Sequence, residues 1–477
     1  MEARLLKFYT LILFVFGSQT AFGNIKKLSL EFLGRNFQIY QSQKQIEFSK
    51  LQYEADDARR QWSANLNGTY SDDSLDGLTI FSVVGTKTKI YSANLEKPFI
   101  WGGQFKFENS YENYSGGNFF TRPLYGFNQK VSYSQNFGAN FLGRQSLLMQ
   151  SILKDEIKVA ELKNEESTNE LFLNFVSQYV DTALAKSNLR LQKDALVRSQ
   201  KRLRLIRKWT RDGLRQKVDL YRAELSELQA KEAVKQAEMN FQSGLESLSV
   251  QIHRKILSLD IAELRRDIFE KPVGNLQTNK THELLKNEVD VLNKKVDKSK
   301  MGLMPVISLN SSYETNAYDN VESNSLSDGT LSGDNSAFAV SLNVNVPIGY
   351  QSQKVEKQQA LIQKMLKDKE LEVFEQNFGY SELSLVKQFR INEENIKLSA
   401  KRLEIAKKSL REFNRLYNKG RASLENVIRS EEDLINTERS YINYLANNKK
   451  IVFRLSHMYG SLKEYLFTQY EEKRGNK

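Results

Sequence analysis

The sequence predicts an α+β membrane protein in which a few β-barrel strands continue into a long α-helical coiled coil, and this arrangement occurs twice along the chain. Three observations carry the prediction. A turn sequence recurs 207 residues further on, long stretches without proline have helical periodicity, and shorter stretches alternate between apolar and polar residues. The internal duplication indicates that each half contributes both strands and helices.

The most specific sign of duplication is a turn at residues 212–226 that recurs at residues 419–433. When Gly213 is aligned with Gly420, both copies have an apolar residue at plus seven, Arg at plus nine and Glu at plus eleven. Upstream of each glycine, apolar residues recur every seven positions, which is the spacing of a coiled-coil seam. These seam residues are Leu189, Leu196 and Leu203 in one copy and Ile396, Leu403 and Leu410 in the other.

The N-terminus has the pattern of a secretory signal. Arg4 and Lys7 precede a short apolar run at residues 8–16, and Ala21-Phe22-Gly23 provides small residues at the positions that a signal peptidase reads. A buried N-terminal helix would share this pattern, but we expect a signal peptide at residues 1–23 and a mature chain from Asn24. No later stretch has about 18 continuous apolar residues, so we expect any membrane crossing to use strands.

Composition argues against several classes of function. The chain has no cysteine and three separated histidines, so we expect no disulfide, no metal site and no cofactor. The net charge is +12, but Lys and Arg alternate with acidic residues along helical stretches, so nucleic acid is not expected as a partner. No catalytic constellation is recognisable, so an exported enzyme is a weaker alternative and we predict a protein that is not an enzyme.

Two long helical hairpins are predicted. Residues 124–271 and 348–477 contain no proline, and proline breaks helix interiors. A helix over residues 141–210 would be about 105 Å long at ~1.5 Å per residue. Each chain segment then turns back at Gly213 or Gly420, because glycine suits a helix C-cap. The apolar stripe of the first hairpin consists of Phe172, Val176, Tyr179 and Ala183.

Strands are predicted where apolar residues alternate with polar or small ones. Residues 337–346 show this best, and ten residues of this kind match a membrane barrel strand. An edge of a soluble sandwich is the alternative. Trp62 and Trp101 at strand ends fit an interfacial aromatic girdle, although core aromatics would explain them equally well. Further strands are predicted at residues 63–70, 86–97, 103–113, 127–137 and 306–315.

Along residues 25 to about 465, the chain resembles the TolC-like outer-membrane efflux and secretion channels, the outer membrane factor family. The opening LSLEFLGRNFQIYQSQKQIEF, the strand ends LEKPF and NVNVPIGY, and the duplicated turn carry the resemblance. It implies a homotrimer in the bacterial outer membrane, with a helical tunnel in the periplasm. It also implies an exit duct of a tripartite efflux pump or a type I secretion system, with a periplasmic adaptor (membrane fusion protein), an inner-membrane pump and outer-membrane lipid as partners.

The resemblance implies about four strands per chain, so the β-barrel must be completed by trimerisation because lipid does not tolerate bare strand edges. One feature departs from the pattern. LNGTY at 66–70 matches LNSSY at 309–313 with an offset of 243, so the first copy holds 36 extra residues. These residues form either an added hairpin or a loop, and we expect the barrel to keep four strands per chain.

These patterns predict the following order of segments. Residues 1–23 are the signal peptide, 24–62 the first helix of repeat 1, 63–140 its strands with the insertion, and 141–271 its helical hairpin. Residues 272–304 are a linker and the first helix of repeat 2, 305–348 its strands, 349–466 its helical hairpin, and 467–477 a C-terminal tail.

The resemblance implies that the channel is gated at the helical tip, meaning residues 211–216 and 417–423. Asp219 and Tyr417 match a closing pair of the family, and we expect the Tyr417 hydroxyl to donate to Asp219. The family's Arg at plus two after the second glycine is Ala422 here, and Arg421 stands one position earlier. Gly213 and Gly420 complete the gating residues, although a plain helix cap would also explain both glycines.

Some members of the family carry paired Asp on the second tip helix, where this chain has Asn426 and Arg429. A ring of Arg would favour anions. We therefore name Asn426, Arg429 and Arg222 as constriction candidates, with a surface ion pair as the alternative for Arg429. A soluble periplasmic coiled-coil scaffold or adaptor protein is the alternative for the whole chain. The adaptor-docking candidates are Arg211, Asp212, Leu214, Arg215, Lys419, Ala422 and Ser423.

Overall fold

The computed structural model describes residues 25–73, 86–116, 120–259, 271–331, 335–346 and 348–472. The predicted signal peptide lies outside these residues, as does the end of the predicted C-terminal tail. Within the described ranges, no helix is both long enough and apolar enough to span a bilayer. The chain forms two compact units, each built from both repeats. The helical unit falls within residues 1–43, 162–283 and 373–477, and the strand unit within 44–161 and 284–372.

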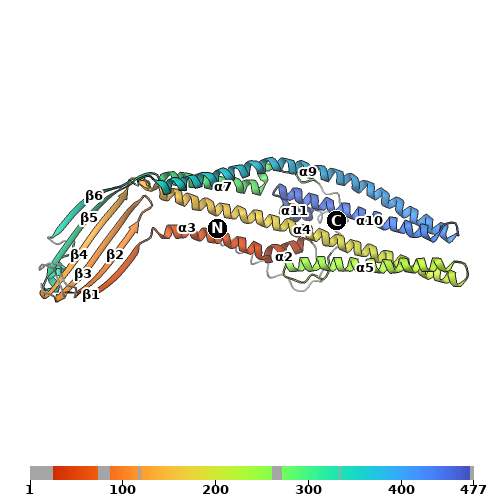
Figure 1. The fold of residues 1–477 in the computed structure, drawn as a ribbon, viewed down its shortest axis with the longest axis horizontal. Coiled ribbons are helices and arrows are strands. Elements are labelled where there is room, and N and C mark those ends of the chain that lie inside the picture. Colours follow the sequence, from red (N-terminus) through yellow and green to blue (C-terminus); the bar gives the residue numbers. More distant parts are fainter. Residues whose placement is uncertain are drawn as a thin grey trace. The chain divides into compact units, whose positions relative to one another are not determined.

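The bounds of the long helices repeat the duplication seen in the turn sequence. Helices α4 and α9 each have 68 residues, and helices α5 and α10 each have 35. The first and last residues of α4 and α5 recur 207 residues later as those of α9 and α10. The hairpin α4–α5 and the hairpin α9–α10 (Figure 1) therefore correspond residue for residue. The bounds are Arg144–Arg211 for α4, Lys217–Gln251 for α5, Gln351–Asn418 for α9 and Leu424–Met458 for α10.

The N-terminal helix is interrupted at Asn36. Its side-chain oxygen accepts a hydrogen bond from the Gln38 amide at 3.0 Å, which caps a new helix start. The predicted first helix is therefore two helices, α2 and α3. The shorter elements are α2 (Ile25–Arg35), α3 (Phe37–Ala58), η2 (Phe141–Gly143), η3 (Leu276–Thr278), α7 (Lys280–Met301), α8 (Glu322–Asp328) and α11 (Leu462–Glu472).

The core of the helical unit contains the predicted apolar stripe. Phe172, Val176, Tyr179 and Ala183 are each at most 2 % exposed. Phe32 of α2 stacks on Phe175 with ring centroids 4.4 Å apart, so the first helix packs directly on α4. Helix periodicity thus identified four residues of the apolar core of this unit.

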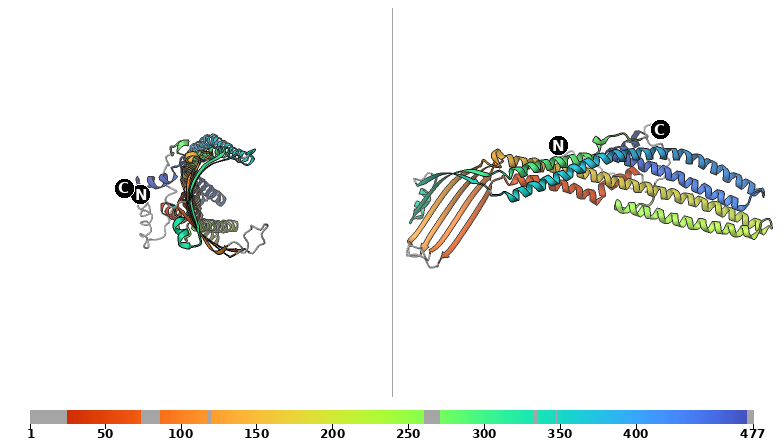
Figure 2. Two further views of the ribbon diagram at one scale, coloured as in Figure 1. Left: turned by 90° about the vertical axis from the view of Figure 1, so that its left-hand side faces the viewer. Right: turned by 45° about the horizontal axis from the view of Figure 1, so that its top comes forward.

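The strand unit is built on one antiparallel sheet with the order β1-β2-β3-β4-β5-β6 (Figure 1). Every stretch that alternation predicted as a strand is a strand. The sheet is curved when viewed along the molecule's long axis (Figure 2). The strands are β1 (Ser63–Asp73), β2 (Thr86–Pro98), β3 (Gly103–Gly116), β4 (Phe120–Asn136), β5 (Val306–Asp319) and β6 (Ser336–Asn345).

The expectation of about four strands per chain is wrong, because six strands form the sheet. The inserted segment contributes the β2–β3 hairpin between β1 and β4. Strand β2 pairs with β1 from Ser63↔Glu96 to Asp73↔Thr86, and β3 pairs with β4 from Gly103↔Gln135 onward. Alternation in a short window cannot distinguish a strand of the main sheet from a projecting hairpin, so the sequence left both possibilities open.

The turn of the inserted hairpin packs tightly on the connection from β4 to α4. A Cβ atom on Gly143 (φ 77°) would lie 2.0 Å from the Ile100 carbonyl oxygen. A Cβ atom on Gly102 (φ 82°) would lie 2.5 Å from the Asn140 carbonyl oxygen. Both positions require glycine for its left-handed φ and for the close approach of two backbones. The hairpin is therefore an integral part of the strand unit.

We expect Gly143→Ala to lower the stability of the strand unit by more than about 2 kcal/mol, since the left-handed φ alone costs ~1–2 kcal/mol and the backbone overlap adds to it. The measurement is loss of circular dichroism on heating the purified protein in detergent. Gly379→Ala on α9 is the control, because its Cβ would meet no atom within 4 Å and alanine favours helix. Equal melting of Gly143→Ala and the unchanged protein would contradict this packing.

Candidate functional site

The two predicted tip turns have the same backbone structure. Gly213 and Gly420 both have φ of 73°, and a Cβ atom on either would meet no atom within 4 Å. Backbone conformation, not crowding, therefore requires glycine here. In each turn the glycine amide and the next amide bond back to the helix end, which is a Schellman motif. The amide after each glycine donates to a carbonyl oxygen five residues earlier. Leu214 donates to Trp209 at 2.8 Å, and Arg421 donates to Leu416 at 2.9 Å.

Arg215 connects the two turns. Its guanidinium lies 4.5 Å from the centre of the Tyr417 ring and 5.7 Å from that of Trp209. It also donates a hydrogen bond to the Tyr417 carbonyl oxygen at 3.1 Å. A cation held over two aromatic faces is attracted by their quadrupoles. Arg215 stands at plus two after Gly213, whereas the sequence reasoning sought such an arginine after Gly420 and named Arg215 only as a docking residue.

The predicted hydrogen bond between Tyr417 and Asp219 is absent. Tyr417 is 3 % exposed, and its hydroxyl has no hydrogen-bond partner among the described residues. Burial raises the pKa of the Tyr417 phenol; the Arg215 charge opposes this shift and the Asp219 charge adds to it. Asp219 is instead placed in the first turn of α5, where the helix dipole favours a carboxylate. The two residues are near each other without being bonded.

Two of the constriction candidates, Arg222 and Arg429, share one acidic partner. Glu425 lies 3.4 Å from the Arg222 guanidinium and 3.7 Å from that of Arg429. The Arg429 side chain is 75 % exposed, so this is a surface ion pair of at most ~1 kcal/mol. Asn426 is exposed, and its backbone N–H donates a hydrogen bond to the Ser423 hydroxyl at 3.3 Å.

The docking candidates divide into exposed and structural residues. Ser423 is the N-cap of α10, and Ala422 packs on the apolar core beneath the turns. Arg211 approaches Asp212 only at 3.9 Å, so both charges stay available at the surface. Leu214 is 69 % exposed. The residues that remain free for a partner are Arg211, Asp212, Leu214, Lys419 and the gating candidate Arg421, all of which are exposed.

The most buried ion pair near the turns was not predicted. Glu431 of α10 is 5 % exposed and pairs with Arg202 and with the Arg198 Nε at 2.7 Å. Arg202 also donates to the Ser226 hydroxyl at 3.2 Å, so this cluster ties α10 to both α4 and α5. The signal in the sequence was the glutamate at plus eleven in both copies. Its counterpart Glu224 makes a more exposed pair with Arg207 at 3.1 Å.

The long helices become strongly cationic as they approach the turns. Residues 198–217 contain nine Lys or Arg and one Asp, and residues 401–421 contain eight and two Glu. These two stretches carry net charges of +8 and +6. Together they carry +14, which exceeds the net charge of the whole chain, +12. The interpretation that charges are evenly mixed is therefore wrong. The exposed basic residues are Lys201, Arg204, Arg207, Lys208, Arg211, Lys217, Lys401, Arg402, Lys407, Lys408, Arg411, Arg415, Lys419 and Arg421.

The two faces of the sheet differ in polarity along one pair of adjacent rows near the middle of the strands. Cross-strand partners share a face, so the register defines rows that cross all six strands. Two adjacent rows differ in polarity, and the β2–β3 hairpin follows the same alternation as the other strands. The next row on the apolar side is mixed, since it contains Leu66 and Ala93 but also Asn109, Gln129, Thr315 and Ser336. The apolar row is Ala64, Leu95, Phe107, Val131, Tyr313 and Phe338; the polar row is Asn65, Asn94, Glu108, Lys130, Glu314 and Ala337.

Charges on the polar face are paired along the sheet. Lys106 lies 2.6 Å from Glu108, and Lys130 lies 2.9 Å from Glu314. These pairs are about one-third exposed on each side chain, so they remain hydrated in the single chain. A face of this kind is suited to contact with water rather than hydrocarbon.

Aromatic residues gather toward both ends of the sheet. At one end, Trp62 packs edge-on against Phe105 at 6.0 Å and Phe99 stacks on Trp101 at 4.4 Å. Toward the other end, Tyr91 and Tyr111 stack at 6.3 Å. From Trp62 to Tyr70, β1 rises by roughly 27 Å at ~3.4 Å per residue. Strands tilted by about 40° need roughly 33 Å to cross the apolar band of about 25 Å in outer-membrane barrels, so this segment spans most of one crossing.

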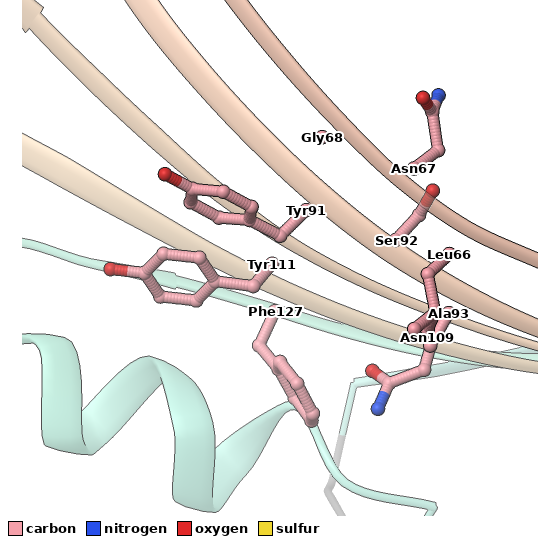
Figure 3. A pocket seen from close by; sticks show the side chains of 9 residues that line it. All are labelled: Leu66, Asn67, Gly68, Tyr91, Ser92, Ala93, Asn109, Tyr111 and Phe127. Carbon is pink, nitrogen blue, oxygen red and sulfur yellow. The ribbon is translucent and has the colours of Figure 1, made fainter.

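A hollow of about 380 Å³ opens over strands β1 to β4. Tyr91, Tyr111 and Phe127 line one side of it, and Asn67 and Ser92 point away from Phe127 (Figure 3). The hollow is open and shallow in the single chain, and its lining is mainly aromatic and aliphatic. It therefore forms part of the apolar face and not a separate polar pocket.

Several solved structures that align with this chain are described as outer-membrane proteins or channels. CusC, whose structures describe folding and transmembrane channel formation, aligns with a TM-score of 0.69 and 15% identity over 95% of each chain. The open state of the Neisseria gonorrhoeae MtrE outer membrane channel aligns at 0.68 with 14% identity, over 93% of this chain and 90% of that one. This chain has the outer-membrane channel fold.

A further structure with the channel fold is the outer membrane protein VceC of Vibrio cholerae, which aligns at a TM-score of 0.67 with 14% identity over 91% of this chain and 96% of VceC. No protein-family model and no curated protein matches the sequence. The resemblance inferred from the duplicated turn is thus confirmed at the level of the fold.

We expect Glu431→Ala to loosen α10 because it leaves two arginines, one of them largely buried, without their partner. Loss of a buried partner costs ~3 kcal/mol, so amide hydrogen exchange in the first turns of α10 should be on the order of 100-fold faster. Glu224→Ala is the matched control from the other repeat, with an expected change of at most a few-fold. Equal exchange in the two variants would contradict the assigned role of Glu431.

Proposed function

We propose that the chain is an outer-membrane channel-tunnel, the exit duct of a tripartite efflux pump or a type I secretion system. The observation that supports this most directly is the two-faced sheet. An apolar face bounded by aromatic residues at both ends suits lipid, and a polar, charged face suits a water-filled lumen. A soluble periplasmic scaffold, the alternative function, would leave the whole apolar row exposed to water.

The proposal includes a homotrimer, since one chain leaves surfaces that need covering. Every residue of β1 and β6 is exposed in the single chain. In the helical unit, α9 exposes Ile391, Leu398 and Ile405 at seven-residue spacing, each at least 58 % exposed. A second exposed stripe on α5 has alternating steps of three and four residues, as a coiled-coil seam has. It consists of Val218, Tyr221, Leu225 and Leu228, each at least 54 % exposed.

The gate is proposed to lie at the helical tip. Arg215 fastens the turn after α4 to the turn after α9, so its release would let the two hairpins separate. Gly213 and Gly420 allow the tight turns, and Asp219, Tyr417 and Arg421 surround this contact. Asn426, Arg222 and Arg429 remain the candidates for lining the constriction between copies.

The partner at the tip is proposed to be a periplasmic adaptor that connects the channel to an inner-membrane pump. The cationic helix ends fit an adaptor surface rich in Asp and Glu, because complementary charge steers association and disfavours wrong partners. Arg211, Asp212, Leu214 and Lys419 would make the first contacts. In this arrangement the helical unit lies in the periplasm and outer-membrane lipid surrounds the sheet.

Membrane fractionation followed by gel electrophoresis without heating tests the proposed function. We expect the protein in the detergent-extracted outer membrane, running unheated at about three times the chain mass and falling to one chain mass after boiling. A soluble periplasmic protein of one chain mass would overturn the channel and favour the scaffold.

We expect Arg215→Ala to increase the open fraction of the channel at least several-fold in planar lipid bilayers, because it removes the contact that joins the two turns. Tyr417→Phe is the matched control. This variant removes only a hydroxyl that makes no hydrogen bond among the described residues, so the open fraction of the Tyr417→Phe channel should equal that of the unchanged protein. An opened Tyr417→Phe channel together with a closed Arg215→Ala channel would contradict this assignment.

A further inference from the structure

The inserted β2–β3 hairpin increases the number of strands that each chain contributes to the membrane. We propose that three copies close an eighteen-stranded barrel, in which β1 of one copy pairs with β6 of the next. This inference rests on the proposed function as a homotrimeric channel. It concerns the strands that form the wall of the barrel. The number of these strands determines how wide the lumen in the outer membrane is.

The hairpin is built into the wall by its pairing and by its side chains. Strand β2 is paired along its length with both β1 and β3, so no direct pairing of β1 with β4 exists in the chain. Leu95 and Phe107 continue the apolar row, and Asn94 and Glu108 continue the polar row. A loop lying over the barrel or projecting from it would not need this alternation in phase with its neighbours.

The two free edges of the sheet suit each other. Because the sheet has an even number of antiparallel strands, β6 of one copy and β1 of the next run in opposite directions and can form an antiparallel ladder. Strands β1 and β6 contain 11 and 10 residues. Neither contains Lys, Arg or Pro, the residues with which soluble sheets protect their edges from pairing. A second copy of this chain is therefore the occupant that both edges fit.

The strand number determines the width of the lumen. Three copies with six strands give eighteen strands, whereas the four strands expected per chain would give twelve. Barrel diameter grows roughly in proportion to strand number, so the lumen is about one and a half times as wide, in the range of aqueous porin channels. A lumen of this width admits hydrated polar solutes without selecting among small ones. Their passage would then be limited by the helical tip and not by the membrane wall.

Cysteine cross-linking tests this arrangement cleanly, because the chain has no cysteine of its own. Asn67 on β1 faces Ser92 on β2 as a register partner. In membranes that hold the assembled protein, we expect Asn67→Cys combined with Ser92→Cys to form a disulfide within one chain. Asn67→Cys combined with Ser132→Cys on β4 is the matched control and should form none. A disulfide between β1 and β4 would mean that the hairpin lies outside the wall.

Closure between copies is tested with Asn67→Cys paired in turn with Ala339→Cys, Ser341→Cys and Asn343→Cys on β6. We expect at least one pair to give disulfide-linked species of two and three chain masses on a denaturing gel, and none larger. Linked species of two chain masses only, or no link between copies at any of the three positions, would overturn the eighteen-stranded barrel. An outer-membrane trimer with β1 linked to β4 would overturn this inference alone, whereas a soluble protein would overturn the proposed function as well.

Discussion

The backbone hydrogen bonds of the sheet impose the strongest constraint on this protein. In a bilayer no water is present to satisfy a bare strand edge, so a lipid-facing sheet must close on itself. In the proposed channel, a sheet of six strands with free edges at β1 and β6 cannot meet this requirement alone. If further copies close the sheet, their helices must be arranged with the same symmetry. Helices of neighbouring copies would then cover the exposed stripes of α5 and α9.

Internal duplication provides the framework, and the two copies have diverged in the contacts they make near the turns. The two turns are superposable in sequence position and in φ, yet only the first carries an arginine, Arg215, that crosses to the other turn. Glu224 and Glu431 occupy the same position in the two repeats, but only Glu431 is buried between arginines. A duplicated scaffold can thus hold one contact between the turns and one buried ion pair without requiring either to be present twice.

Much of the fold followed from short-range pattern. Two-residue alternation located all six strands, and seven-residue spacing together with Gly213 and Gly420 located both hairpins. The pairing partner of each strand did not follow, because register and strand order depend on contacts distant in sequence. The place of β2 and β3 in the wall therefore became visible only in the sheet itself.

The site was less predictable than the fold. The expected hydrogen bond between Tyr417 and Asp219 is absent, because the Tyr417 hydroxyl is buried without a partner among the described residues and Asp219 lies in the first turn of α5. Arg215 depends on the packing of two hairpins separated by about 200 residues, which no local pattern encodes. The cationic character of α4 and α9 near the turns was hidden in the sequence because acidic residues of α5 and α10 follow directly.

In the proposed channel, one face of the sheet, inserted hairpin included, contacts lipid and the other contacts water. Nitroxide labels on single cysteines introduced at each position from Gln104 to Tyr111 of β3, in outer-membrane vesicles, test it most directly. We expect labels at odd positions such as Phe107 to be relaxed by oxygen dissolved in lipid, and labels at even positions such as Glu108 by a water-soluble quencher. Uniform exposure to water along β3 would contradict it.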